Sequence, residues 1–337
     1  MNLNIRYFCE YDLLQWEKLL LNFKKSISYS FWFLKYQEIL FKKLKIKNFS
    51  FVVLDKENPC AIFPLYVENI NNVSQISFGE EPVYSPIFAK KFSSNNKRKI
   101  INYGFEVIKK YKKKYNVETE RYQISPFHFD KKLLNFYIEN NFKDVISYPD
   151  WYIFKCNKTF VLDLNQEFHS IKKKIRKGHY ANFKKTLKYA KLNIISQENP
   201  DRTLFNHYIK SYYKVKGQKR TKQAFELDFD GINGKYQVIF CCIVNDRIIG
   251  AVAIHTYGKL ARYNSSFRDI EFCDNLFPTH YLLMESIKYL KEKGFELLEI
   301  GGKVDSKKYS ISVKEFNLSH FKSGWGGDCY PWYKFER

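Results

Sequence analysis

Residues 237–302 carry the pattern that most restricts the fold. Three apolar, strand-like runs follow one another with short polar turns between them, which predicts an antiparallel meander. A helix is predicted next, because Pro278 suits a first helical turn and Gly294 suits the position just past a helix end. A further apolar strand then ends in two glycines. The expected strands are QVIFCCIV (237–244), IIGAVAIHTY (248–257), KLARYNSSF (259–267) and FELLEIGG (295–302).

The first half of the chain shows a weaker version of the same order. Two apolar runs, FSFVVLD (49–55) and CAIFPLYV (60–67), precede an amphipathic helical pattern over 95–115 and a strand pattern over 121–125. Both halves thus run from helices to antiparallel strands, then to a long helix and another strand. We interpret this order as a duplicated α+β unit, with the boundary near residues 155–160.

The formal net charge of +22 allows two interpretations. A strongly basic protein is attracted to polyanions such as tRNA, to nucleotide diphosphates and to anionic lipid headgroups. Alternatively, the excess reflects a compositional bias toward lysine, asparagine and isoleucine, with the lysines simply solvated. The fractions of hydrophobic (45%) and charged residues (27%) fit a globular protein rather than a disordered one.

Several kinds of site have no support in the sequence. The seven cysteines form no C-x-x-C pair and the seven histidines show no metal-binding spacing, so no metal site is expected. No Walker loop, G-x-S-x-G or G-x-G-x-x-G motif joins a strand to a helix. With no apolar leader and no run of about 18 apolar residues, we expect a cytoplasmic protein. The acidic pairs Glu80/Glu81 and Asp228/Asp230 lack a matched acid–base partner and are predicted to lie in loops.

The glycines near the C-terminus mark a candidate site. Gly301 and Gly302 would let the end of a strand face a cleft without side chains in between, although a tight turn is the simpler interpretation. Further on, FKSGWGG (321–327) places Lys322 among glycines, between two aromatic residues. A lysine so placed stabilises an oxyanion or holds a phosphate, or else it is a solvated loop residue.

In their order, these segments resemble the FemABX-type aminoacyltransferases, a branch of the GNAT acyltransferase superfamily. The resemblance rests on IRKGHYANFKKTLKYAKLNI (175–194), on NLFPTHYLLMESIKYLKEKGFELLEIGG (275–302) and on the closing FKSGWGG. In the first half, SFWFLKYQE (30–38) and EPVYSPIF (81–88) are similar to two further family segments.

The resemblance implies two tandem GNAT-like domains, each with a mixed central sheet flanked by helices. Residues 1–157 would lie on the acceptor side and residues 158–320 on the donor side, with the segment 321–337 returning toward the first domain. Lys322 corresponds to the family lysine at the reaction centre. Two further positions correspond to substrate-binding residues of the family. Lys35 corresponds to the lysine that binds the diphosphate of a nucleotide-linked acceptor, and Tyr263 corresponds to a tyrosine that faces the substrate.

Other residues follow from the same resemblance. Lys214 and Arg220, with Lys216 between them, fall in the region that supplies a second phosphate-binding cation. The remaining implied substrate-binding residues are Tyr84, Gly301 and Gly302.

Two departures from the family pattern bear on the substrates. Neither half has the Q/R-x-x-G-x-G/A loop with which acetyl-CoA enzymes of the superfamily bind pyrophosphate, which argues against simple acetyl-CoA use. EEPVYSPIFAKK (80–91) carries basic residues where cell-wall members of the family have an acidic one. A nucleotide sugar, a glycan or another amine is therefore as good an acceptor as a peptidoglycan precursor.

The expected activity is acyl or aminoacyl transfer that forms an amide. The donor would be an aminoacyl-tRNA or an acyl thioester such as acyl-CoA, acting as co-substrate with no bound cofactor. The acceptor would be the amine of a cell-wall or nucleotide-linked glycan precursor, reached in the cytoplasm or at an anionic inner membrane face. Two alternatives stay open: an acyl-CoA-dependent N-acyltransferase of amino sugars for surface polysaccharide, and a non-catalytic polyanion-binding protein on a degenerate GNAT fold.

The implied residues also have plainer interpretations. Lys35 would then be an ordinary surface lysine, and Tyr263 a core or strand residue. The run Lys172–Lys174 with Arg176 and Lys177 would be a solvated helix face rather than a site for tRNA or donor phosphate.

Overall fold

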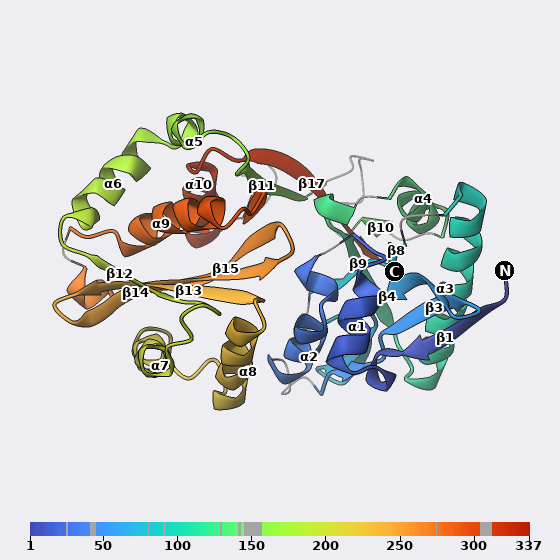
Figure 1. Ribbon diagram of the computed structural model, residues 1–337. Helices are drawn as coiled ribbons and strands as arrows, with labels where there is room; N and C mark the ends of the chain where they lie inside the picture. The colour runs from blue at the N-terminus through green and yellow to red at the C-terminus, as the bar shows by residue number, and fades with distance from the viewer. Residues whose placement is uncertain are drawn as a thin grey trace. The chain divides into compact units, whose positions relative to one another are not determined.

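The structure of the chain is a computed structural model (Figure 1). It describes residues 1–337 except 25, 41–44, 80, 90–91, 129, 141–142, 145–156, 274 and 304–311. Glu80, predicted to lie in a loop, is outside the described residues. The chain divides into two compact units, Met1–Asn157 with Pro331–Arg337, and Lys158–Tyr330.

The first unit contains a four-stranded antiparallel sheet and a second group of strands. The sheet has the order β1 (Leu3–Tyr7), β3 (Phe51–Asp55), β4 (Asn58–Phe63), β8 (Ile87–Phe88). The second group comprises β2 (Lys47–Asn48), β5 (Tyr66–Ile70), β6 (Val73–Ile76), β7 (Val83–Tyr84), β9 (Thr119–Ile124), β10 (Lys143–Asp144) and the end of β17 (Asp328–Glu336). The helices are η1 (Phe8–Glu10), α1 (Leu13–Leu20), η2 (Ile27–Tyr29), α2 (Phe31–Leu40), α3 (Ser94–Lys114), η4 (Pro126–His128) and α4 (Lys131–Glu139).

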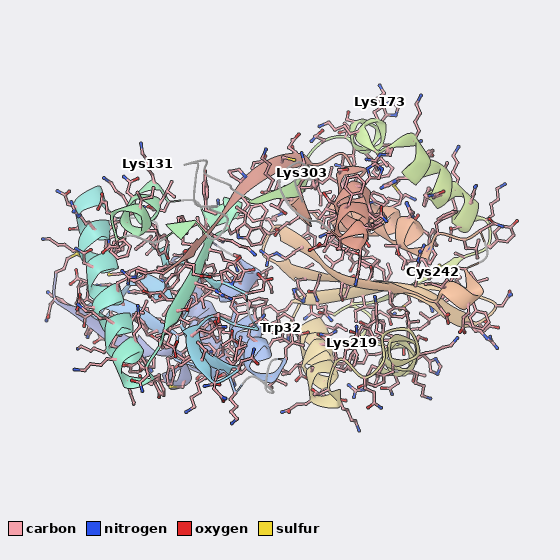
Figure 2. The ribbon with its side chains drawn as sticks, turned by 180° about the vertical axis from the view of Figure 1, so that it is seen from behind. Trp32, Lys131, Lys173, Lys219, Cys242 and Lys303 are labelled. Carbon is pink, nitrogen blue, oxygen red and sulfur yellow. The ribbon has the colours of Figure 1, made fainter. Side chains whose placement is uncertain are left out.

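Aromatic side chains fill the core of the first unit. Trp16 of α1 is fully buried, and its Nε1 donates a hydrogen bond to the Tyr29 carbonyl oxygen at 2.8 Å. Trp32, labelled in Figure 2, lies on α2. Its ring stacks on that of Tyr36, with ring centroids 4.8 Å apart. A buried indole that keeps a hydrogen-bond partner combines a large apolar area with a satisfied polar group, which accounts for the stability of this packing.

The second unit is built on a mixed sheet, in which the strands β12, β13, β14, β15, β16 and β11 lie side by side in this order. β12 to β15 pair antiparallel in sequence order, β15 then pairs parallel with β16, and β16 pairs antiparallel with β11. The strands are β11 (Asn157–Asp163), β12 (Lys191–Ile195), β13 (Gln237–Val244), β14 (Arg247–Tyr257), β15 (Leu260–Arg268) and β16 (Leu297–Lys303).

Helices cover both faces of this sheet (Figure 1). One face carries α5 (Phe168–Lys174), α6 (Lys177–Leu187), α9 (Pro278–Glu292) and α10 (Val313–Ser323); the other carries α7 (Arg202–Lys216) and α8 (Lys222–Asn233). Successive residues of a strand point to opposite faces. Val252 therefore packs in the core under α9, whereas Ala251 and Ala253 pack in the core over α7 and α8. A short helix, η5 (Ile270–Phe272), follows β15.

The meander, the helix begun by Pro278 and the strand ending in glycines are confirmed. Most of 166–191 is helical, in two helices, because Ile175 is extended and, with Arg176, separates α5 from α6. A tertiary contact holds this break, since the Arg176 backbone N donates a hydrogen bond to the Gly324 carbonyl oxygen at 2.8 Å. The loop expected at Asp228 and Asp230 is also wrong, because both residues lie within α8.

Candidate functional site

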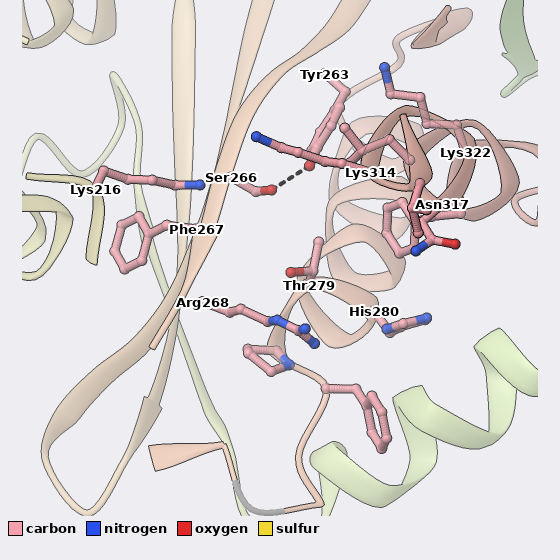
Figure 3. Close-up of a pocket in the computed structure, with 15 residues that line it drawn as sticks. Lys216, Tyr263, Ser266, Phe267, Arg268, Thr279, His280, Lys314, Asn317 and Lys322 are labelled. Atoms are coloured by element: carbon pink, nitrogen blue, oxygen red, sulfur yellow. Dashed lines mark hydrogen bonds between the residues drawn. The ribbon is translucent and has the colours of Figure 1, made fainter. Parts of the chain in front are cut away.

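A cavity of about 570 Å³ opens in the second unit where two parallel strands separate (Figure 3). β15 pairs with β16 only along Leu260–Arg262, and the following residues of β15 line the cavity. The first residues of α9 and one side of α10 complete the wall. The lining residues are Lys216, Tyr263, Ser266, Phe267, Arg268, Phe277, Pro278, Thr279, His280, Val313, Lys314, Asn317, Leu318, Phe321 and Lys322.

The charge of the cavity is positive. Lys216, Arg268, Lys314 and Lys322 line it, and none of the described lining residues is acidic. In Figure 3, Lys216 and Lys314 extend toward Ser266 from opposite sides. Burial lowers the pKa of Lys216, and the charge of Lys314 lowers it further. The lysines are therefore close enough to repel one another, and an anionic ligand between them would relieve that repulsion.

Lys322 lies beside the glycine strand end. It belongs to the last turn of α10, so the solvated glycine loop considered from the sequence is wrong. A Cβ atom added to Gly301 would lie 2.8 Å from Lys322 Nζ, and the backbone of Gly301 has φ +112°. The register of β11 with β16 shifts at this point, so that Phe160 faces Gly301 and Val161 faces Glu299. The bulge and the missing side chain together make room for the amine.

The surroundings of Lys322 weaken its hold on a proton. Burial lowers its pKa, and the nearby carboxylate of Glu299 partly offsets this effect. Within the part of the chain that the structure describes, the side-chain amine of Lys322 makes no hydrogen bond or ion pair. An amine that is shielded from water and has no ion-pair partner can interact strongly with a negatively charged ligand.

Glu299 is held in place beneath the cavity. It is 1% exposed, and it accepts hydrogen bonds from Arg262 Nε at 2.6 Å and from Thr159 Oγ1 at 3.0 Å. A buried carboxylate that accepts several hydrogen bonds is held in one position. Glu299 is therefore a carboxylate held in a fixed position near Lys322.

Tyr263 and His280 add neutral polar groups to the cavity wall. The hydroxyl groups of Tyr263 and Ser266 share a hydrogen bond of 2.5 Å. Burial raises the pKa of Tyr263, while the bond to Ser266 lowers it. Burial, with the charges of His179 and Arg268, lowers the pKa of His280 to about 3. His280 is thus neutral near pH 7, and Tyr263 offers an O–H group there.

The other glycines of the closing motif serve packing. A Cβ atom at Gly324 would lie 2.3 Å from His179 Nε2, and one at Gly327 would lie 2.9 Å from the Val161 backbone. His179 Nε2 donates a hydrogen bond to the Phe321 carbonyl oxygen at 2.8 Å, and Trp325 beside it is fully buried. These contacts anchor α10, and with it Lys322, to the core of the unit.

The structure does not bring Lys214 and Arg220 to the cavity. Lys214 pairs with Asp269 at 2.8 Å and with Glu271 at 3.0 Å, beside a different hollow. Arg220 Nη1 lies 2.9 Å from Oδ2 of the buried Asp228, near the start of α8. Lys216, between them in the sequence, is the cation from this region that lines the cavity.

The remaining implied residues lie elsewhere or contribute backbone only. Lys35 is exposed on α2, with Nζ 4.5 Å from the centre of the Phe31 ring. Tyr84 is 6% exposed in the first unit, where it stacks on Phe78. Gly302 is exposed at the end of β16, and an added Cβ atom would meet only the Lys158 carbonyl oxygen, at 3.8 Å.

Sequence reasoning missed Arg268, His280 and Lys314. Arg268 ends the third strand of the meander, and His280 is the third residue of α9. Their placement follows from the separation of β15 and β16, which no sequence pattern signals. Lys314 was missed because α10 itself was not predicted.

Two further kinds of feature are absent from the described residues. They contain no group of three or more histidine, cysteine, aspartate or glutamate residues that could hold a metal ion. None of their helices is both long and apolar enough to cross a bilayer.

The sequence matches no protein-family model and no curated protein. Solved structures do match the fold. The crystal structure of FemX aligns with a TM-score of 0.63 at 13% identity, covering 89% of this chain and 90% of that one. The structure of L-PGS from Bacillus licheniformis aligns with a TM-score of 0.61 at 13% identity, covering 97% of this chain and 92% of that one. A tandem GNAT protein from the clavulanic acid biosynthesis pathway aligns with a TM-score of 0.51 at 10% identity, covering 99% of this chain and 98% of that one.

These similarities establish the fold. The chain has the α+β architecture of two tandem GNAT-like domains, as expected, and shares it with FemX. At these identities the similarity does not extend to individual site residues, so the chemistry must be argued from the cavity itself.

Proposed function

We propose that the protein transfers an acyl group from a phosphate-bearing donor to the amine of an acceptor, forming an amide. The observation that carries the proposal is the cavity lined by Lys216, Arg268, Lys314 and Lys322, with no acidic residue among its described lining. Unpaired cations in one hollow favour a ligand with several negative charges. Fold similarity to FemX and to tandem GNAT proteins supports acyl transfer as the general class of reaction.

Lys322 is the group we assign to the reacting carbonyl. The acceptor nitrogen attacks the carbonyl carbon, and the carbonyl oxygen becomes an oxyanion that the Lys322 ammonium stabilises. Collapse of this intermediate breaks the bond to the donor oxygen or sulfur and leaves the amide. The proton lost by the nitrogen goes to the leaving group or to solvent. Lys216, Arg268 and Lys314 would hold the donor phosphates and so fix the carbonyl relative to the attacking amine.

Substitution of Lys322 tests the proposal. In Lys322→Met, kcat should fall about a hundredfold or more, comparable to loss of one oxyanion donor. Steady-state turnover with aminoacyl-tRNA and with acyl-CoA, each against amino-sugar and nucleotide-linked amine acceptors, provides the assay. Lys110→Met on the exposed surface of α3 is the control and should keep its activity. A loss below about fivefold in Lys322→Met would remove this residue from the mechanism.

The same assay separates the alternatives. Turnover with acyl-CoA in the absence of RNA would favour an N-acyltransferase of amino sugars. Turnover only with aminoacyl-tRNA would favour transfer to a cell-wall or nucleotide-linked glycan precursor. A protein that binds polyanions but yields no product with either donor would be the non-catalytic alternative.

An acceptor carried on a lipid is a second candidate, favoured by α10. Val313, Phe316 and Leu318 of this helix are 77%, 48% and 48% exposed, and the first and last of them line the cavity. An exposed apolar group at a polar site is suited to an acyl chain or a membrane surface. If the acceptor is lipid-linked, Phe316→Ser should raise KM for acceptor in vesicles while leaving KM for a water-soluble analogue unchanged.

A further inference from the structure

A second hollow of the second unit has no part in the proposed reaction. Its volume is about 390 Å³, and none of its described lining residues also lines the cavity of Lys322. It is bounded by α7, by the turn between β13 and β14, and by η5. Figure 1 shows α7 on the face of the sheet opposite α9. A hollow of this volume is large enough for a small molecule.

Apolar side chains form the floor of this hollow. Leu204, Ile248 and Ile249 line it and are 8%, 9% and 2% exposed. Phe272 lines it as well but is 40% exposed, and Arg247 Cζ lies 4.8 Å from the centre of its ring. Small-molecule sites typically combine such an apolar surface with a few well-placed polar groups.

The rim of the hollow carries charges of both signs. Lys214 and Asp269 line it and pair with each other, so their charges are already balanced. The side chains of Lys210, Arg247 and Asp246 also line it, and none of the three forms an ion pair with a described residue. The described part of the rim therefore offers two positive charges and one negative charge to a ligand.

The hairpin turn fixes the positions of Asp246 and Arg247. Asn245 and Asp246 have φ of +47° and +59° and form a two-residue turn, across which Val244 pairs with Arg247. Asparagine and aspartate tolerate this left-handed backbone, whose twist matches that of the flanking strands. Opposite charges are thus presented by two consecutive residues, directly beside the apolar floor.

We infer that this hollow binds a free α-amino acid with an apolar side chain. Its carboxylate meets Arg247 and Lys210, its ammonium meets Asp246, and its side chain lies on the apolar floor. Both charged groups of an α-amino acid are bonded to one carbon atom, so they need partners of opposite charge close together, as the turn supplies them. The inference goes beyond the proposed function and does not depend on it.

Other small ligands fit the hollow less well. A plain carboxylate or a phosphate ester would be repelled by Asp246, and a plain amine would be repelled by Lys210 and Arg247. A polar ligand with no apolar group would leave the floor and the Phe272 ring exposed to water.

Calorimetric titration of the full chain with four probes tests the inference. L-leucine and L-phenylalanine should bind with a Kd of about 1 mM or below. Glycine lacks the apolar side chain, and 4-methylpentanoate is leucine without its ammonium group. Each of these two should bind at least about tenfold more weakly than leucine, because each loses one of the three interactions.

Variants then assign the binding to this hollow. Arg247→Gln should weaken leucine at least about tenfold, as expected for loss of a charged hydrogen-bond partner. Asp246→Asn keeps a residue suited to the turn, and it should weaken leucine while leaving 4-methylpentanoate unchanged or tighter. Lys110→Gln, exposed on α3, is the control and should bind leucine as wild type does. Thermal unfolding of each variant confirms that it is folded.

Three outcomes would overturn the inference. Absence of binding by both leucine and phenylalanine would leave the hollow without this ligand. Leucine binding that is unchanged in Arg247→Gln would place the amino acid elsewhere. Binding of 4-methylpentanoate as tight as that of leucine in wild type would show that Asp246 does not meet an ammonium group. None of these measurements involves turnover, so they are independent of the Lys322→Met assay.

Discussion

At the scale of single residues, the site depends on how closely Gly301 and Lys322 approach. The sequence marked both segments as candidates for one site, because glycines at a strand end and a lysine in a second glycine motif each suggested a close approach of the backbone to a ligand. It did not indicate that Lys322 would lie on a helix, nor that Gly301 would sit at a bulge opposite Phe160. Those features depend on partners more than a hundred residues away along the chain.

Replacing Gly301 by alanine should impair both reaction and stability. The new Cβ atom would lie 2.8 Å from Lys322 Nζ and would displace the amine. The φ of +112° is also strained for any residue with a side chain, at a cost of about 1 to 3 kcal/mol. We expect kcat to fall about tenfold or more and the free energy of unfolding to fall by this strain energy.

Gly302→Ala is the matched control for Gly301→Ala. Its added Cβ atom meets no atom closer than 3.8 Å, and its backbone is not in the left-handed region. Turnover and urea unfolding of the two variants should therefore differ clearly. Equal losses in both would mean that any side chain at this strand end is harmful, and that the contact with Lys322 is not the cause.

At the scale of elements, some helices could be predicted from the sequence and others could not. α9 was predictable because it begins with proline, ends before glycine and has a regular apolar face. α10 was not, because Val313, Phe316 and Leu318 are exposed and disturb the amphipathic pattern. α8 was missed for another reason, since its acidic residues suggested a loop, whereas the buried Asp228 is held by Arg220.

The ion pair of α8 predicts that Arg220 stabilises the unit and does not bind substrate. Asp228→Ala would remove the carboxylate that pairs with the Arg220 guanidinium, and removing one member of a buried ion pair typically costs about 3 to 5 kcal/mol. The double variant Arg220→Met/Asp228→Leu removes both charges and should recover most of that loss, measured by urea unfolding. Its kcat/KM should equal that of wild type. If the double variant is folded but its KM for donor or acceptor rises strongly, Arg220 would instead be a substrate-binding residue.

At the scale of the whole molecule, the structure shows where part of the net charge of +22 lies. Four cations gather around the cavity, and nine more lie between residues 172 and 191 of the same unit. The bias toward lysine was visible in the sequence, but its clustering around one strand opening was not, because that clustering requires α6, α9 and α10 to be packed together. The lysines of α3 in the first unit show that compositional bias also contributes.

Buried histidines should make the second unit sensitive to acid. Burial lowers the pKa of His255 on β14 to about 3, and that of His280 also to about 3, against an ordinary value near 6.5. Between these values the unfolded chain binds more protons than the folded one, so the free energy of unfolding falls as the pH falls. The stabilisation is complete above about pH 6.5 and is lost progressively down to about pH 3. Each histidine contributes up to about 1.4 kcal/mol per pH unit in this window.

His255→Leu tests this pH dependence without altering the cavity, since His255 does not line it. Leucine fills a similar volume and binds no proton, so the variant should lose stability less steeply than wild type between pH 6 and pH 4. Urea unfolding at half-unit pH intervals gives both slopes, and the difference should approach about 1.4 kcal/mol per pH unit. Parallel curves for the two proteins would mean that His255 becomes protonated without unfolding. The acid sensitivity would then have to come from His280 and the cavity around it.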